Sequence, residues 1–271
     1  MPLPFLGEGK RFVANALNNV CWMFQYYRTI WAIKRTSVKP LRLPVFNKIL
    51  ILVPHADDEL IGCFESVTTY CFGFTGEAVP HKNIQSRNLE IKDASIKLQF
   101  NLILSNENFY DELKGIIQEG GWDLICVPNL IDWHNDHLAV NHVLRKVLDE
   151  LGEIKKTIQI LSYQISVPFL EDGFTHYLPM DKQEQSLKWR VFRDVYKTQY
   201  NIPAFRFKLN ERIAGQLIGL HAAELYSIAP FETYKEVLDA WQPIDRSILR
   251  TAINNISSVR KTIKTLRLKI G

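Results

Sequence analysis

One imidazole and three carboxylates follow a short apolar run near residue 50. The run Ile49–Val53 consists of isoleucine, leucine and valine, which predicts a buried strand. The segment His55–Glu59, which reads His-Ala-Asp-Asp-Glu, comes one residue later. Open α/β sheets bind ligands at the carboxyl ends of their strands, so this cluster lies where chemistry is expected. A structural turn does not require a histidine and three acids within five residues.

A second polar cluster follows another apolar run. The strand-like run Asp123–Pro128 is followed by Asp132–His137, which contains two histidines and two aspartates. If both runs are strands whose carboxyl ends lie at one edge of a sheet, their histidine and aspartate side chains can converge on one metal ion. Imidazole nitrogen and carboxylate oxygen without thiolate suit zinc in an open catalytic site, where three protein ligands leave a position for water.

Together the two clusters resemble the paired motifs of the PIG-L/LmbE-type deacetylases. Segment His55–Glu59 is similar to the family's H-P-D-D-E signature, and Asp132–His137 is similar to its later D-x-H-x-D-H. Lys188 and Tyr196–Gln199 are more loosely similar to the family's K-x-x-A-x-x-x-H/Y-x-S-Q stretch. The segment His221–Tyr226 is loosely similar to the family's A-E-x-F element. The resemblance covers about residues 48–235, judged from the order of the motifs.

The resemblance implies a zinc-dependent hydrolase that removes an N-acetyl group, mostly from N-acetylglucosaminyl conjugates. Carried over position by position, the metal ligands are His55, Asp58 and His137. Asp57 is then the general base for a metal-activated water and later the acid that protonates the departing amine. His134 stabilises the oxyanion. Zinc is the expected ion, although ligand chemistry alone leaves another divalent metal open.

Further residues are expected around this centre. Asp132 and Asp136 can orient the histidines from behind. Arg87 is a candidate substrate anchor, since the family has an arginine near this place, but it can equally be a solvated helix residue. Glu59 caps the following helix or holds the turn, without a chemical step.

The sequence departs from the family pattern directly after the first motif. Ala56 replaces the usual proline, a small change in a turn. The family's glycine pair is absent, since Gly62 is followed by cysteine and phenylalanine, and Phe74–Glu77, which matches a T-D-G-E-like turn, follows closely. We therefore expect the helix after the motif to be shortened or lost and the adjoining pocket wall to differ from the family's.

Strand-like and helix-like segments alternate through the middle of the chain. The predicted strands are 48–53, 67–74, 100–104, 123–127 and 158–164, and the predicted helices are 86–98, 109–119, 138–151, 182–199 and 210–226. This alternation predicts an α/β fold with a mostly parallel, Rossmann-like sheet and helices on both faces.

Charge is distributed unevenly along the 271 residues, whose formal net charge is +4. Residues 1–48 carry a net charge of +7 and residues 246–271 another +7, so the part between them is acidic, at −10. Both ends also carry apolar residues at helical spacing. We therefore expect a basic amphipathic extension over 1–47, the deacetylase domain over 48–245, and a basic amphipathic helix over 246–271.

The basic ends have three interpretations. Each apolar stripe can pack against the body or another subunit, which allows a homo-oligomer, or it can attach to an anionic membrane surface. Nucleic-acid binding is disfavoured, because the body is acidic and no reading motif is present. The stripes consist of Val13, Leu17, Val20, Phe24, Tyr27 and Trp31 at the N-terminal end, and of Leu249, Ala252, Ile256, Val259, Ile263, Leu266 and Ile270 at the C-terminal end.

Composition indicates the compartment and leaves two functional alternatives. Four scattered cysteines without C-x-x-C spacing predict free thiols in a reducing environment. No convincing signal peptide and no apolar run of about 20 residues are found, so we expect a cytoplasmic protein, either free or at the membrane surface. The alternatives are an amide hydrolase with a different acyl or non-sugar substrate, and a non-catalytic membrane-peripheral or scaffolding protein.

Overall fold

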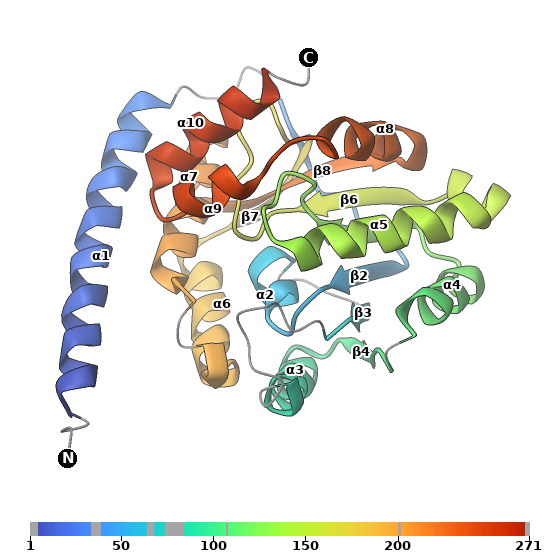
Figure 1. The fold of residues 1–271 in the computed structure, drawn as a ribbon, viewed down its shortest axis with the longest axis horizontal. Coiled ribbons are helices and arrows are strands. Elements are labelled where there is room, and N and C mark those ends of the chain that lie inside the picture. Colours follow the sequence, from blue (N-terminus) through green and yellow to red (C-terminus); the bar gives the residue numbers. More distant parts are fainter. Residues whose placement is uncertain are drawn as a thin grey trace.

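The computed structural model describes residues 5–33, 39–63, 68–73, 84–106, 108–199 and 202–268. Within these residues the chain forms a sheet of eight strands flanked by helices (Figure 1). The strands are β1 (Leu41–Arg42), β2 (Ile49–Val53), β3 (Thr68–Cys71), β4 (Asn101–Leu104), β5 (Leu124–Pro128), β6 (Gln159–Tyr163), β7 (His176–Met180) and β8 (Ala222–Pro230). The helices are α1 (Phe5–Ala32), α2 (Asp58–Gly62), α3 (Ile84–Leu98), α4 (Phe109–Gly120), α5 (Asn135–Glu150), α6 (Lys182–Val195), α7 (Ala204–Ile218), α8 (Phe231–Trp241), α9 (Ser247–Ala252) and α10 (Ile256–Arg267), with 3-10 turns η2 (Gly152–Lys156) and η3 (Lys197–Gln199).

The strand order is β1-β7-β8-β6-β5-β2-β3-β4. Strands β4, β3, β2, β5 and β6 pair in parallel, and β8 runs antiparallel between β6 and β7. The chain moves outward from β2 to β4 on one side and then returns to continue with β5 and β6 on the other. The point where this direction reverses lies between β2 and β5, which is where open α/β sheets form their binding crevice.

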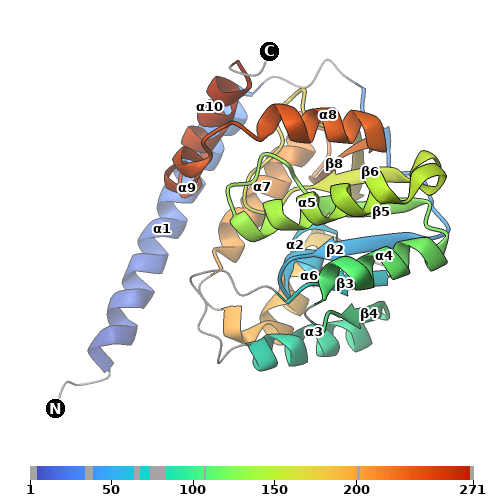
Figure 2. The same ribbon diagram turned by 45° about the vertical axis from the view of Figure 1, so that its right-hand side comes forward.

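Both faces of the sheet are covered by helices, as the alternation of segments predicts (Figure 2). Leu50 and Leu52 of β2 pack with residues of α4, α5 and α8 on one face. Ile51 and Val53 point to the opposite face and pack with α2, α3 and α6. A strand that is buried on both sides needs apolar residues at every position, which explains the continuous run Ile49–Val53.

The helix predicted over 210–226 is wrong beyond Ile218. Helix α7 ends there because Gly219 takes a left-handed conformation with φ of 81°, and β8 starts at Ala222. Alanine and glutamate favour a helix by local propensity, but pairing with both β6 and β7 overrides that preference. The start of β8 comes so close to α7 that only glycine fits at position 215.

The C-terminal stripe packs against the body of the protein. Its residues from Leu249 to Leu266 are buried, and most of them share a core cluster with Val167 and Trp241. Ile270, the last residue of the predicted stripe, lies outside the described residues. The described apolar side chains of this stripe are therefore buried within the protein, as the interpretation of packing against the body predicts.

The C-terminal segment forms two helices rather than the single one predicted over 246–271. Asn255 interrupts it and caps α10, because its side chain accepts hydrogen bonds from the N–H groups of Ser257 and Ser258. The cap turns α10 relative to α9, and both helices still bury their apolar side.

Helix α1 also packs on the body, but not through its predicted stripe. Trp22, Tyr26 and Ile30 pack around Leu209 of α7 and Ile256 of α10. The described stripe residues lie on the other side of the helix and are exposed, and the first stripe position, Val13, has a side chain outside the described set. The N-terminal part of α1 extends past the rest of the molecule (Figure 2).

The tight contact between α7 and β8 predicts a large cost for adding a methyl group at Gly215. A Cβ atom there would lie 2.6 Å from the backbone nitrogen and Cα of Ala222. We expect Gly215→Ala to lower the free energy of unfolding by about 1–3 kcal/mol in urea titrations, as overpacking does. The control is Gly115→Ala in α4, where a Cβ meets nothing within 4 Å and helix propensity should add about 0.5–1 kcal/mol. Equal stabilities of the two variants would contradict this account of the contact.

Candidate metal centre

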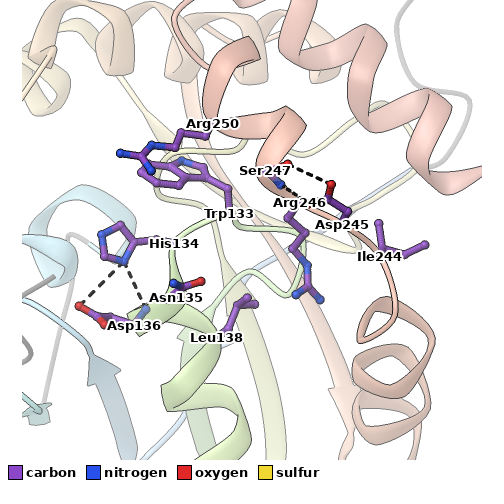
Figure 3. A pocket seen from close by; sticks show the side chains of 10 residues that line it. All are labelled: Trp133, His134, Asn135, Asp136, Leu138, Ile244, Asp245, Arg246, Ser247 and Arg250. Atoms are coloured by element: carbon purple, nitrogen blue, oxygen red, sulfur yellow. Dashed lines mark hydrogen bonds and ion pairs between the residues drawn. The ribbon is translucent and has the colours of Figure 1, made fainter. Parts of the chain in front are cut away.

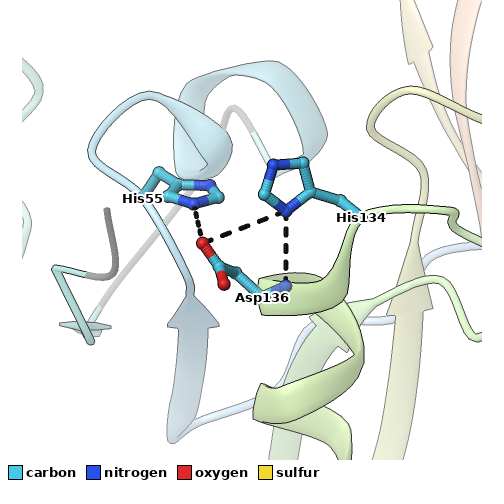
Figure 4. Close-up of side chains that lie close together, drawn as sticks. All are labelled: His55, His134 and Asp136. Atoms are coloured by element: carbon cyan, nitrogen blue, oxygen red, sulfur yellow. Dashed lines mark hydrogen bonds and ion pairs between the residues drawn. The ribbon is translucent and has the colours of Figure 1, made fainter. Parts of the chain in front are cut away.

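The two polar clusters meet at the edge between β2 and β5. These strands are adjacent and parallel, with Ile51 opposite Cys126, so their carboxyl ends point the same way. The segment after β2 carries His55, and the start of α5 after β5 carries His134 and Asp136 (Figure 4). The sequence motifs therefore share one site, although they are separated by about 80 positions along the chain.

One group of possible metal ligands consists of His55, Asp58 and His137. One ligand atom from each lies within 4.8 Å of the other two, and all three side chains are buried. Asp58 Oδ2 is 3.2 Å from His55 Nδ1 and 3.7 Å from His137 Nε2. Two imidazole nitrogens and one carboxylate oxygen form a donor set that zinc accepts in catalytic sites.

Asp132 lies behind this group. Its Oδ2 is 3.0 Å from His137 Nδ1, and its Oδ1 accepts a hydrogen bond of 2.7 Å from Ser166 Oγ. A carboxylate behind a ligating histidine fixes the orientation of the ring and leaves the other nitrogen free for a metal ion. The donor set and this supporting carboxylate fit a divalent ion at His55, Asp58 and His137.

A second group, His55, His134 and Asp136, also has ligand atoms within 4.8 Å of one another. Asp136 Oδ2 lies 2.8 Å from His55 Nε2 and 4.0 Å from His134 Nδ1 (Figure 4). This group shares His55 with the first, but its other two members are only partly buried. Asp136 can orient His55 from its Nε2 side while Nδ1 faces Asp58.

The charged groups in the site shift one another's pKa values. Burial lowers the pKa of His55, but hydrogen bonds with Asp136 and Asp58 outweigh it and raise the pKa to about 9. Burial raises the pKa of Asp58, yet nearby His137 and His55 bring it below its usual value. Burial also raises the pKa of Asp132, but the nearby His137 outweighs it and the pKa falls to about 2. The carboxyl groups of Asp58 and Asp132 therefore stay ionised.

His134 is held as a neutral hydrogen-bond donor. Burial and the neighbouring His137 and His55 lower its pKa to about 4. Its Nδ1 accepts a hydrogen bond of 3.3 Å from the backbone N–H of Asp136, which caps the start of α5. In a neutral ring the hydrogen must then be on Nε2, which can donate to an oxygen in the site.

Asp57 occupies a strained turn between the first ligand and α2. Its φ is 123°, a backbone conformation that costs about 1–3 kcal/mol in a residue other than glycine. Its N–H donates to Glu59 Oε2, and its Oδ1 accepts a hydrogen bond of 3.1 Å from Arg87 Nη2. Burial and nearby Asp58 raise the pKa of Asp57 well above its usual value, although Arg87 acts in the other direction. This carboxyl group can therefore hold a proton under conditions where an exposed aspartate cannot.

Arg87 is buried and contacts this turn, so the alternative of a solvated helix residue is wrong. Its Nη2 also donates to the carbonyl oxygen of Ala56 at 3.1 Å. The side-chain oxygen of Gln199, with the amide oriented to satisfy both groups, accepts from Nη2 at 2.6 Å and from Nε. Contact of Arg87 with a substrate stays a prediction; the observed contacts position Asp57.

The segment Tyr196–Gln199 links the turn at Glu59 to Glu90 of α3 through hydrogen bonds. The Tyr196 hydroxyl donates to Glu59, and the Thr198 N–H and hydroxyl donate to the Glu90 carboxylate at 2.7 and 2.6 Å. Glu59 thus holds the turn, as expected, and burial raises its pKa to about 7. These contacts are a physical reason for the looser motif that the sequence shows here.

Lys188 stabilises the end of α2 through a hydrogen bond and two buried ion pairs. Its Nζ donates to the carbonyl oxygen of Ile61 at 2.8 Å and lies 2.5 Å from Glu224 Oε1 and 2.7 Å from Glu211 Oε1. All three charged groups are buried, so each depends on the others. Helix α2 ends at Gly62, and the predicted turn Phe74–Glu77 lies outside the described residues.

Comparison with known proteins defines the fold. No protein-family model and no curated protein matches the chain. The solved structure of N,N'-diacetylchitobiose deacetylase from Pyrococcus horikoshii is 18% identical, with a TM-score of 0.55 over 70% of this chain and 86% of that one. The conserved protein TT1542 from Thermus thermophilus is also 18% identical, with a TM-score of 0.53 over 68% of this chain and 95% of that one.

A third similar structure is the zinc-inhibited form of teicoplanin deacetylase Orf2. It is 14% identical, with a TM-score of 0.52 over 67% of this chain and 97% of that one. The chain therefore has the fold of the LmbE-like deacetylases, which confirms the fold that the two motifs imply.

The geometry predicts which residues retain a metal ion. We expect His55→Ala, Asp58→Ala and His137→Ala each to abolish zinc retention, because each removes one of three donors whose ligand atoms lie within 4.8 Å. Zinc per protein chain would be measured after dialysis. The control is His142→Ala, an exposed histidine on α5 that is not in either ligand group. Retention of zinc by Asp58→Ala and His137→Ala would contradict this assignment. Loss of zinc in His55→Ala, His134→Ala and Asp136→Ala would then favour the second group, because His55 belongs to both.

Proposed function

We propose that the protein is a metal-dependent hydrolase that removes the acetyl group from an N-acetylated sugar conjugate of the N-acetylglucosaminyl type. The observation that carries the proposal is the buried group His55, Asp58 and His137, with Asp57 and His134 beside it at one edge of the sheet. A bound zinc ion would act as a Lewis acid and lower the pKa of a water molecule toward about 7. Another divalent metal fits the same donors.

Asp57 is the proposed general base. Its carboxyl is fixed by Arg87 and lies in a buried turn directly before Asp58. Burial raises the pKa of this group, so it can take a proton from the attacking water and keep it until the amine departs. The same proton then completes the free amino sugar, and acetate leaves.

His134 is the proposed donor to the developing oxyanion. Its neutral ring and Nε2–H suit a hydrogen bond to the acetamide oxygen, which gains negative charge when water adds to the carbonyl carbon. A protonated histidine could also stabilise that charge, but the low pKa of His134 favours the neutral donor. Asp132 and Asp136 orient His137 and His55 without a chemical step.

The sugar is supported by the resemblance of the motifs and by the chitobiose deacetylase among the similar structures. A different acyl group or a non-sugar amide is the alternative within the same chemistry. A purely non-catalytic scaffold is disfavoured, because the base, the oxyanion donor and the ligand group are held together by buried contacts that a scaffold would not need.

Asp57→Asn is the sharpest test of the chemistry. It keeps the size of the side chain but removes the proton acceptor, so acetate release should fall by on the order of 10²-fold or more while zinc content stays near that of the wild type. His134→Ala should spare the metal and slow turnover by a similar order. The substrates would be a panel of N-acetylglucosaminyl conjugates, with acetate measured directly.

Asp194→Asn serves as the control for loss of one carboxylate, because this aspartate is exposed on α6 and belongs to neither ligand group. Unchanged turnover of Asp57→Asn would reject this residue as the base. Absence of acetate release from every N-acetylated sugar, with zinc bound, would reject the sugar substrate and leave the other amides.

We further propose that α1 attaches the protein to an anionic membrane surface. The stripe residues Leu17, Val20, Phe24, Tyr27 and Trp31 are 57–91% exposed, while the opposite side of the helix packs on α7 and α10. Such a stripe suits the interfacial region of a bilayer, and the net charge of +7 over residues 1–48 would attract anionic lipids. Within the described residues no helix is long and apolar enough to cross a bilayer.

The cytoplasmic location, the oligomeric state and the domain boundaries at 47/48 and 245/246 stay predictions.

Flotation with vesicles tests this attachment. Phe24→Ser with Trp31→Ser removes two exposed aromatic residues, each worth about 1.5–3 kcal/mol when buried, so the bound fraction should fall more than tenfold. The wild type should float with phosphatidylserine vesicles at low salt and less with neutral phosphatidylcholine. Ile96→Ser, an equally exposed apolar residue on α3, is the control. Equal flotation of wild type and double variant, or no flotation of either, would reject membrane attachment through this stripe.

A further inference from the structure

A cavity of about 430 Å³ lies beside the metal centre (Figure 3). One wall consists of Trp133, His134 and Asp136, from the segment that begins α5. The opposite wall is built by the C-terminal segment, where Arg246 and Arg250 line the cavity at α9. This second wall lies outside the part of the chain that resembles the deacetylase motifs, so it is a feature of this chain's own C-terminal segment.

Arg246 is half-buried and forms no ion pair with an acid among the described residues. Its Nη2 donates to the carbonyl oxygen of Trp241 at 2.7 Å, but its Nε is buried without a hydrogen-bond partner in the same part of the chain. Burial lowers the pKa of Arg246, because removing a guanidinium from water is unfavourable. The adjacent Asp245 is turned toward the start of α9, where it accepts from the N–H of Ser247 at 2.9 Å and from its hydroxyl at 3.0 Å.

Arg250 lies over the ring of Trp133, with its guanidinium carbon 5.6 Å from the ring centroid. The Trp133 ring is in turn 5.2 Å from that of His134, so this guanidinium is close to the proposed oxyanion donor (Figure 3). No carboxylate of the described residues forms an ion pair with Arg250 or Arg246. Asp136 lines the cavity on the side of the metal centre and is hydrogen-bonded to His55.

We propose that this cavity binds an anionic group of the substrate, a phosphate ester or a carboxylate, through Arg250 and Arg246. This inference rests on the proposed deacetylase function, since it places the N-acetyl group at His134 and the anionic group on the far side of Trp133. Arginine presents a planar set of N–H donors that matches both phosphate and carboxylate oxygens. A cavity of this volume is within the range of small-ligand sites.

The two arginines of the cavity lack an ion-pair partner among the described residues. Two guanidinium groups line one cavity, and one of them is half-buried. Asp132 acts electrostatically on Arg246, but no carboxylate of the described residues forms an ion pair with either arginine. An anion in the cavity would supply a partner for Arg250, which lies over Trp133, or for Arg246, and it would be recognised at a distance from the bond that breaks. The arginines should therefore affect binding of the substrate more than the rate of the chemical step, so KM should change more than kcat.

Binding of sugars that cannot be deacetylated tests the cavity separately from the reaction. The probes are glucose 1-phosphate, glucuronate and glucose, measured by calorimetry on the zinc-loaded full-length protein. We expect one or both anionic probes to bind at least about tenfold more tightly than glucose, and Arg250→Gln to remove that difference, as loss of a charge-assisted hydrogen bond does. Comparing the phosphate with the carboxylate shows which anion the cavity prefers.

Arg250 is the primary variant, because its side chain is exposed and, within the described residues, contacts the ring of Trp133 without donating a hydrogen bond. Arg246→Lys is a second variant that keeps the positive charge but lacks the planar guanidinium group. It should partly weaken binding of the anionic probes. Arg190→Gln on α6 is the control, since this exposed arginine does not line the cavity. Equal binding of glucose and both anions, or unchanged anion binding in Arg250→Gln, would overturn the proposal.

Turnover distinguishes this proposal from the proposed function. With N-acetylglucosamine 1-phosphate and neutral methyl N-acetylglucosaminide as substrates, the wild type should prefer the phosphate by KM, and Arg250→Gln should lose that preference. Anion binding without acetate release from any sugar would keep the anion site and reject the deacetylase. Acetate release with equal KM for both substrates in wild type and Arg250→Gln would keep the deacetylase and reject the anion site.

Discussion

The parallel pairing of β2 with β5 is the constraint on which the rest of the site depends. These two strands leave the sheet at the same edge, at the point where the chain changes its direction of travel across the sheet. Without that pairing, His55 and Asp58 on one segment would not lie within reach of His137 on another. Both strands are buried on two faces, which fixes their register firmly, because a slip by one residue would exchange the two cores. The precision of the polar site therefore derives from apolar packing below it.

A buried polar site also needs support, because each ionised group taken out of water costs several kcal/mol unless it finds partners. The structure provides two layers of them. Arg87 holds Asp57 and is itself contacted by Gln199, while Tyr196 and Thr198 bind Glu59 and Glu90. Farther from the site, Lys188 joins Glu211 and Glu224 under the last turn of α2. These contacts stabilise the strained backbone at Asp57, so the turn keeps a geometry that local preference alone would disfavour.

Most of this arrangement can be predicted from the sequence, and the exceptions have physical reasons. Continuous apolar runs predict β2 and β5, and polar residues directly after them predict a shared site, because both features follow from local chain geometry. The helix predicted over 210–226 fails after Ile218, since Ala222–Glu224 has helical propensity but is a central strand between two partners. The role of Arg87 at Asp57 depends on a contact over 30 positions that no local pattern shows. The stripe of α1 illustrates the same limit: periodicity predicts a helix, but it does not tell which of two apolar sides meets the body.

The C-terminal segment links parts of the molecule that the sequence suggests are separate. Its charge and periodicity are those of a detachable amphipathic end, yet α9 and α10 bury their apolar side in a core that includes Val167 and Trp241. The same segment contacts α1 through α10 and presents Arg246 and Arg250 to the cavity beside His134. Its basic residues consequently do not form one uniform surface: Arg260 pairs with Glu171, while Arg246 and Arg250 have no carboxylate partner in the described part of the chain. A surface helix, a cavity wall and the metal centre are thus connected through one short stretch of packed structure.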